Sequence, residues 1–173
     1  MNSRIKIVLL INIALFCAVI FLRPAYAEEP IDPYKVKAGY LFNFTKFITW
    51  ADNSTETFNI CIVGNDPFGS LIDPIQQRSA FNLPIKLFRI EHPNQIPNCH
   101  IIYFSKNTRP LKSNNTLTVG EGGDFIKQGG MIAFIERDNK IKLQINLKLL
   151  QENNLKISAK LLEVSEVTGG NND

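Results

Sequence analysis

Short runs of hydrophobic residues, bounded by polar and turn-forming residues, recur along most of the chain. The runs are rich in β-branched and aromatic residues, which is typical of strands. Six such runs lie at 58–64, 83–90, 99–105, 115–120, 131–136 and 140–147. The last two flank the polar sequence RDNK and predict a β-hairpin.

Helical spacing is clearest in residues 34–50, where Leu41, Phe44 and Ile48 fall on one face. Aromatic residues also lie on its other sides. This helix is therefore either buried between the sheet and loops or exposes an aromatic strip that docks a partner. Shorter helices are predicted at 65–79, where Pro74 shortens or breaks the helix, at 120–130 and at 147–154. Residues 155–164 fit a strand or a helix equally well.

Strands that alternate with helices predict an α/β fold. We expect a single layered domain over residues 28–173, with a mixed β-sheet of about six strands flanked by helices. The C-terminal sequence TGGNND is expected to be a short disordered tail.

The first 27 residues have the layout of a secretory signal peptide. Arg4 and Lys6 provide a basic start, residues 7–22 are apolar, and AYA at 25–27 is a small-x-small cleavage site. The apolar stretch is shorter than the ~20 residues that cross a bilayer. We therefore expect residues 1–27 to be removed and residues 28–173 to be exported.

The formal charge of +3 belongs to this N-terminal segment. Without Arg4, Lys6 and Arg23, the remaining 16 basic residues balance the 16 acidic residues. A neutral chain has no electrostatic attraction to nucleic acid, and no polybasic run points to a membrane surface.

The exported part of the chain contains two cysteines, Cys61 and Cys99. Cys99 precedes His100, and such a pair suggests a thiol–imidazole dyad or a metal site. Neighbours on a strand point to opposite faces, so a dyad is poorly placed. Together with His92, these residues also lack the paired spacing of zinc motifs. Export favours a Cys61–Cys99 disulfide, with His100 as a partly buried structural residue.

No catalytic motif stands out elsewhere. The patterns G-x-S-x-G and C-x-x-C and a phosphate-binding loop are absent, and the carboxylates are scattered. We therefore expect no enzyme activity, no catalytic residue, no metal site and no cofactor.

Several segments in order resemble the YfiR/HmsC family. They are YKVKAGYLFNFTKFITW (34–50), CIVGNDPFG (61–69), CHIIYFS (99–105), LTVGE (117–121), FIKQGGMI (125–132), LQINL (143–147) and LKISAKLL (155–162). The resemblance covers roughly residues 34–163. It implies a periplasmic, non-catalytic α/β protein that represses a membrane-anchored diguanylate cyclase by binding its periplasmic sensor region. Cyclic-di-GMP and biofilm output are thereby lowered.

The resemblance also implies partners and contacts. An outer-membrane lipoprotein is implied as a second partner. Cys61 and Cys99 are the positions of a family disulfide that is either a static staple or a redox switch. Independently of the resemblance, we expect a monomer or a homodimer. The candidate partner-binding residues are Phe42, Trp50, Ile132, Gln144 and Asn146. Three features depart from the family pattern. Gln144 replaces a glutamate, Ala159 replaces one of two serines, and the segment after residue 105 is short, so that a helix there is lost or reduced.

A second hypothesis is a periplasmic small-ligand receptor or carrier whose ligand controls a membrane partner. Sheets with parallel strands offer crevices at the strand ends, where such a ligand would bind.

Overall fold

The computed structural model describes residues 31–51, 55–106 and 108–169. The predicted signal peptide, residues 1–27, lies outside the described residues.

Most strands belong to one eight-stranded mixed sheet with the order β10-β8-β7-β6-β5-β2-β4-β3. Its parallel strands are β2 (Phe58–Val63), β4 (Leu83–Ile90), β5 (Ile101–Phe104), β6 (Leu117–Glu121) and β7 (Ile132–Arg137). The remaining strands are β3 (Ser79–Ala80), β8 (Lys140–Asn146) and β10 (Glu166–Thr168). Strand β8 is antiparallel to β7, β10 is parallel to β8, and β3 is antiparallel to β4. A separate antiparallel pair joins β1 (Ile48–Trp50) to β9 (Leu155–Ile157).

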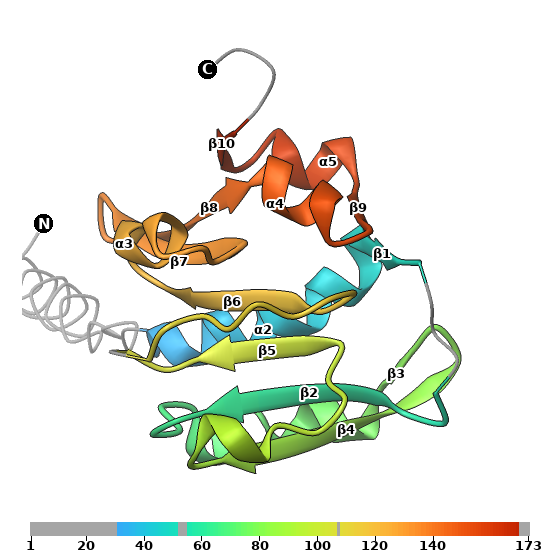
Figure 1. Cartoon of the computed structure of the whole chain (residues 1–173). Helices are drawn as coiled ribbons and strands as arrows, with labels where there is room; N and C mark the ends of the chain where they lie inside the picture. Colours follow the sequence, from blue (N-terminus) through green and yellow to red (C-terminus); the bar gives the residue numbers. More distant parts are fainter. Residues whose placement is uncertain (1–30, 52–54, 107, 170–173) are drawn as a thin grey trace, which may run out of the picture. The chain divides into compact units, whose positions relative to one another are not determined.

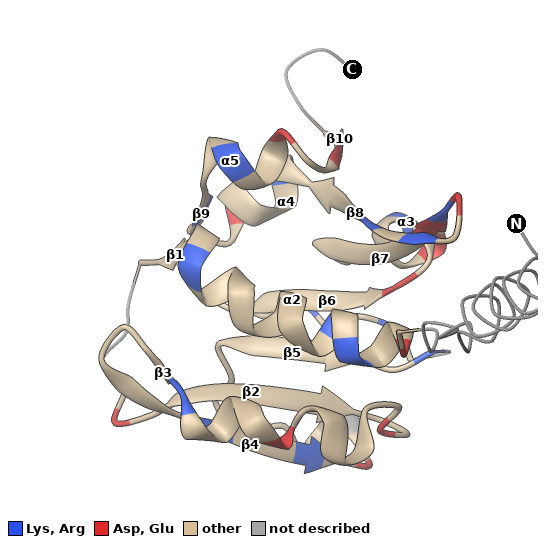
Figure 2. Ribbon diagram, turned by 180° about the vertical axis from the view of Figure 1, so that it is seen from behind, with Lys and Arg blue, Asp and Glu red and all other residues tan. Residues whose placement is uncertain are grey.

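Among the described residues, the helices are short except for α2 (Pro33–Phe47). The others are α3 (Gly123–Lys127), α4 (Leu147–Glu152) and α5 (Ala159–Leu162), with 3₁₀ turns η1 (Gly69–Leu71), η2 (Asp73–Gln77) and η3 (Pro93–Gln95). Figures 1 and 2 show α2 lying across one face of β5 and β6.

The two faces of the sheet bury two separate hydrophobic clusters. Leu41 and Phe44 of α2 pack with Ile60 and with residues from η2 and α4 on one face. Phe125 of α3 packs with Phe104 and with both cysteines on the other face. Side chains alternate between the faces along each strand, which is why the central strands read as continuous hydrophobic runs.

The predicted α/β class is confirmed, and so is the hairpin. Asp138 and Asn139 adopt positive φ values of 50° and 55°, which suits the tight turn between β7 and β8. The estimate of about six strands was too low, because short pairings at the sheet edges and the β1–β9 pair add strands that no long hydrophobic run announces.

The predicted helix 34–50 ends earlier than expected. Asp32 caps α2 by accepting a hydrogen bond from the Tyr34 amide at 2.8 Å. Helix α2 then stops at Phe47, because Ile48–Trp50 alternate buried, exposed and buried and pair with β9.

Three other segments differ from the prediction. Residues 65–79 form two 3₁₀ turns instead of an α-helix, and Pro74 is the second residue of the second turn. The ambiguous segment 155–164 contains a strand followed by a helix. Thr168 was predicted to lie in the tail but pairs with Asn146 as part of β10, whereas residues 170–173 lie outside the described residues. Within residues 105–106 and 108–116, no helix is present, as expected from the short segment.

Candidate functional site

The structure joins Cys61 and Cys99 in a disulfide across 38 sequence positions. Cys61 lies in the middle of β2, and Cys99 lies just before β5, the neighbouring strand. Their side chains are 0% and 4% exposed, so the cross-link sits inside the cluster on the α3 face of the sheet. Both α-carbons are 6.1 Å apart, within the usual range for a disulfide.

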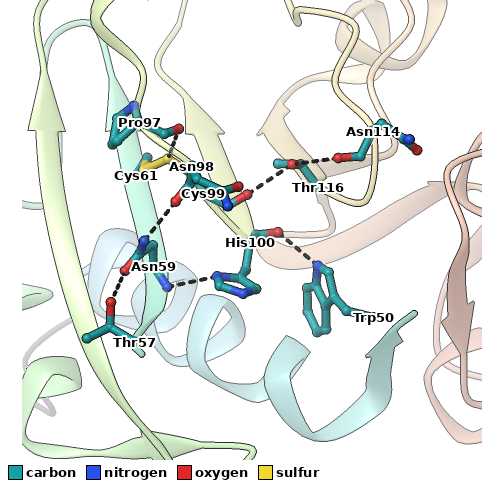
Figure 3. Close-up of a disulfide and its surroundings, with 10 residues drawn as sticks. All are labelled: Trp50, Thr57, Asn59, Cys61, Pro97, Asn98, Cys99, His100, Asn114 and Thr116. Carbon is teal, nitrogen blue, oxygen red and sulfur yellow. Dashed lines mark hydrogen bonds between the residues drawn. A yellow bond between two sulfur atoms is a disulfide. The ribbon is translucent and has the colours of Figure 1, made fainter. Parts of the chain in front are cut away.

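Hydrogen bonds around the disulfide fix the start of β5 (Figure 3). The His100 amide donates to the Asn59 carbonyl at 2.9 Å, and the Asn59 amide donates to His100 Nδ1 at 3.0 Å. The Asn59 side chain also donates to the Asn98 carbonyl at 2.7 Å. From the β1 side, Trp50 Nε1 donates to the His100 carbonyl at 3.0 Å. The cross-link is therefore embedded in a rigid junction of β1, β2 and β5.

Cys99 and His100 do not form a catalytic dyad. Both residues were predicted to lie in a strand, but β5 starts only at Ile101 and contains neither of them. Their side chains nevertheless point to opposite faces: Cys99 packs in the cluster that contains Ile102, whereas the His100 ring stacks on Phe58 with centroids 4.4 Å apart. Because Cys99 is bonded to sulfur and His100 is 4% exposed, the pair is structural.

A second polar cluster lies where β5 and β6 end, against the first turns of α2. Lys37 Nζ forms an ion pair with Glu121 Oε1 at 2.9 Å, and the Tyr103 hydroxyl donates a hydrogen bond to the same oxygen. The Lys37 ammonium also lies 4.2 Å from the centroid of the Tyr34 ring. The side chains of Lys37 and Glu121 are only 9% and 17% exposed, so this ion pair is largely screened from water.

The surroundings keep Glu121 ionised. Burial disfavours its charge, but hydrogen bonds from Tyr103 and Lys37 outweigh burial and hold the pKa of Glu121 below its usual value. Burial, followed by the hydrogen bond to Glu121, raises the pKa of Tyr103 well above that of a free tyrosine. At neutral pH the cluster therefore contains a carboxylate with an ammonium and a neutral phenol as donors.

Two adjoining hollows open beside this cluster, at the carboxyl ends of the strands. They have volumes of about 530 Å³ and 810 Å³ and share the residues Lys106, Glu121, Gly122 and Gly123. The larger one is also lined by Gln144, whose Oε1 is buried without a hydrogen-bond partner among the described residues. Pockets of this size at strand ends are where small ligands bind in sheets of this kind.

Two of the predicted partner-binding residues are in the core. Trp50 is 3% exposed and Ile132 is 0% exposed, and both pack in the cluster under α2. The prediction that they form a contact surface is therefore wrong for this fold: β1 turns Trp50 inward, and alternation along β7 does the same to Ile132.

The other three predicted residues are partly exposed. Phe42 lies on α2, with Lys46 Nζ 4.7 Å from its ring centroid. Gln144 and Asn146 lie on β8, where Asn146 caps α4 by accepting a hydrogen bond from the Leu149 amide at 3.0 Å. Phe42 is thus far along the chain from the hairpin residues, and the two regions belong to different elements.

Sequence reasoning missed the cluster of Lys37, Tyr103 and Glu121. Glu121 directly follows the buried run LTVG, and Tyr103 is in the neighbouring parallel strand. The carboxyl ends of parallel strands meet at one edge of the sheet. The positions of Tyr103 and Glu121 near the ends of their strands were therefore the signal from which their proximity could have been predicted. The position of Lys37 depended on how α2 lies on the sheet, which no local pattern indicates.

The geometry can be compared with known proteins. Among the described residues, no group of three or more His, Cys, Asp or Glu residues is arranged to hold a metal ion. No curated protein matches the chain. The family model of YfiR/HmsC-like proteins matches residues 34–166, from α2 to the start of β10 and well over half of the chain. This chain therefore belongs to the YfiR/HmsC-like family.

Proposed function

We propose that this chain is a periplasmic regulator that represses a membrane-anchored diguanylate cyclase by binding the periplasmic sensor region of the cyclase. The observation that carries the proposal is the family match over residues 34–166, since the family points to regulators of cyclic-di-GMP signalling that act with such a cyclase. Lower cyclic-di-GMP and less biofilm would follow. The protein would act by binding alone, without catalysis.

Two features support a periplasmic location. Residues 1–27 have the layout of a signal peptide, and the Cys61–Cys99 disulfide suits an oxidising compartment. The described helices include none that is both long and apolar enough to cross a membrane.

Repression by binding requires that the regulator prefers the inactive state of the cyclase. A shift from 1% to 99% inactive cyclase needs a preference of about 10⁴-fold. A rigid regulator adds no ordering cost on binding, so more of the contact free energy remains as affinity for the inactive cyclase. The disulfide and the hydrogen bonds around His100 support that rigidity.

The surfaces proposed for this contact are the exposed side of α2 around Phe42 and the hairpin of β7 and β8 around Gln144 and Asn146. An outer-membrane lipoprotein that covered one of these surfaces would release the cyclase.

Co-purification from membranes tests the proposal. Tagged protein with its disulfide intact should recover a membrane-anchored diguanylate cyclase, and deletion of the periplasmic region of that cyclase should abolish recovery. If the intact cyclase and the truncated cyclase are recovered equally, or if no cyclase is recovered, the proposal is wrong.

A small-ligand receptor is the second candidate, and the hollows beside Glu121 favour it. The larger hollow has about 810 Å³, which falls within the range of ligand pockets. The ionised Glu121 and the unpaired Oε1 of Gln144 would orient a polar ligand there. Native mass spectrometry of freshly purified protein should then show a retained molecule that is lost in the Glu121→Gln variant. Protein of unliganded mass throughout would count against a receptor.

A further inference from the structure

Gly39 lies in the middle of an α-helix, at a position where nothing inside the fold requires a glycine. Helix α2 runs from Pro33 to Phe47, so Gly39 is well away from both ends. Glycine in a helix interior costs about 1 kcal/mol relative to alanine. A Cβ atom added at Gly39 would meet no atom within 4 Å, so neither packing nor a close neighbour accounts for it. The position faces open space.

That space is a small groove between α2 and the turns η1 and η2. It has a volume of about 190 Å³. The residues that line it are Lys35, Ala38, Gly39, Phe42, Leu71, Ile72, Pro74, Ile75 and Arg78. All of them are apolar except two, Lys35 and Arg78, and none is acidic.

The groove floor continues onto exposed apolar surface. Leu71 is 39% exposed, and Val36, one helical turn before Gly39, is 36% exposed. Phe42 lies one turn after Gly39 and is partly buried against the core. We call the groove with this lining the α2 groove, and Val36 extends its apolar surface along α2 by one helical turn from Gly39.

Exposed cations surround the α2 groove. Lys46 Nζ and the Arg78 guanidinium lie 4.7 Å and 5.7 Å from the Phe42 ring centroid, and Lys35 lines the opposite end. Among the described residues, none of these three cations forms an ion pair. Figure 2 shows basic residues, coloured blue, near both ends of α2. The rim is therefore positive, although the exported chain as a whole is neutral.

We propose that the α2 groove docks an amphipathic segment of the partner protein that carries carboxylates beside an apolar anchor. The volume is well below the 300–1,000 Å³ of typical small-molecule sites, so the groove suits a side chain of a macromolecule. The unpaired cations select an acidic segment by charge complementarity. Gly39, which lacks a side chain, lets the backbone of that segment approach α2 closely.

The inference rests on the proposed function, because the segment is assigned to the periplasmic region of the repressed cyclase. It goes further by choosing the α2 groove over the β7–β8 hairpin and by specifying the charge of the partner. The groove also gives a role to Phe42, because its ring forms part of the apolar lining close to two of the cations.

The test measures the affinity of the purified periplasmic region of the cyclase for variants at Gly39. Gly39→Leu fills the groove with a strong helix former and should weaken binding at least about tenfold. Its unfolding midpoint should equal or exceed that of the wild type, since a Cβ atom meets nothing there. Gln151→Leu, at an exposed position of α4, adds the same side chain elsewhere and should leave the affinity unchanged. Arg78→Glu should slow association and reduce its dependence on salt.

Each alternative outcome is distinguishable. If the wild type binds but Gly39→Leu binds equally well, the inference is overturned while the proposed function stands. If Gly39→Leu changes only the oligomeric mass of the isolated protein, a second copy occupies the groove and the inference is wrong. If the wild type fails to bind the cyclase, both fail.

Discussion

Breaking the Cys61–Cys99 disulfide should destabilise the protein strongly. The bond closes a loop of 38 sequence positions. In the chain-entropy model, a loop of this length removes about 13 cal/mol/K from the unfolded chain, which corresponds to about 4 kcal/mol at 25 °C. Roughly 140 folded residues unfold with about 2.1 cal/mol/K each. The loss should therefore lower the melting temperature by roughly 14 °C.

Two perturbations separate the cross-link from the packing of its sulfur atoms. Reduction of the wild type breaks the bond but keeps both sulfurs, whereas the Cys61→Ala/Cys99→Ala variant also leaves a cavity, because Cys61 is fully buried. Reduction should cost about 4 kcal/mol, and the double variant should cost more.

Trp50 provides the readout for this measurement. It is the only tryptophan of the chain and is 3% exposed, so its fluorescence should change when the core unfolds. Urea unfolding would be followed for oxidised, reduced and double-variant protein. If the reduced wild type stays within about 1 kcal/mol of the oxidised protein, the loop-entropy reasoning is refuted.

The other predictions concern the polar cluster and the glycines. Glu121→Gln should lower the free energy of unfolding at pH 7 by about 3 kcal/mol, because the buried Lys37 ammonium loses its counter-ion. The fold lowers the pKa of Glu121. The contribution of this carboxylate to the free energy of unfolding is therefore complete above about pH 4.3, the ordinary pKa of a glutamate, and is lost as the pH falls through its lower pKa in the folded state. Urea unfolding at pH 7 and pH 3 should therefore show a smaller pH effect for the variant than for the wild type, and equal effects would contradict the assignment. Gly130→Ala should cost at least about 2 kcal/mol, because its Cβ would lie 2.1 Å from the Phe125 ring. Gly39→Ala is the matched control, because the added Cβ lies in open space, and it should not destabilise the protein. Equal losses of stability for both variants would contradict the prediction.

The hydrophobic pattern predicted the sheet well, because burial on both faces makes central strands continuous apolar runs. Strand β4, residues 83–90, has the predicted bounds. The hairpin followed from turn residues that tolerate positive φ at Asp138 and Asn139. These signals are local, so a single sequence contains them.

Errors occurred where distant partners decide the local structure. Ile48 and Trp50 continue the helical pattern of α2, but pairing with β9 draws them into a strand. The same pairing buries Trp50, which the sequence suggested as a surface contact. A helical pattern cannot reveal a competing strand more than a hundred residues away.

The candidate sites also include features that the sequence predicts and features that only the folded structure reveals. Compartment and cysteine number favoured the bond between Cys61 and Cys99 without any coordinates. In contrast, the ion pair of Lys37 and Glu121 depends on the placement of α2 over the strand ends. The significance of Gly39 required knowing that its side of the helix is open.

The most direct test of the proposed repression is the cyclic-di-GMP level of cells with and without this protein. Removal of the protein should raise cyclic-di-GMP, and the increase should disappear when the partner cyclase lacks its periplasmic region. Protein with its disulfide intact, supplied to the periplasm, should restore the low level. An unchanged cyclic-di-GMP level after removal, or an increase that persists with the truncated cyclase, would contradict repression through the periplasmic region.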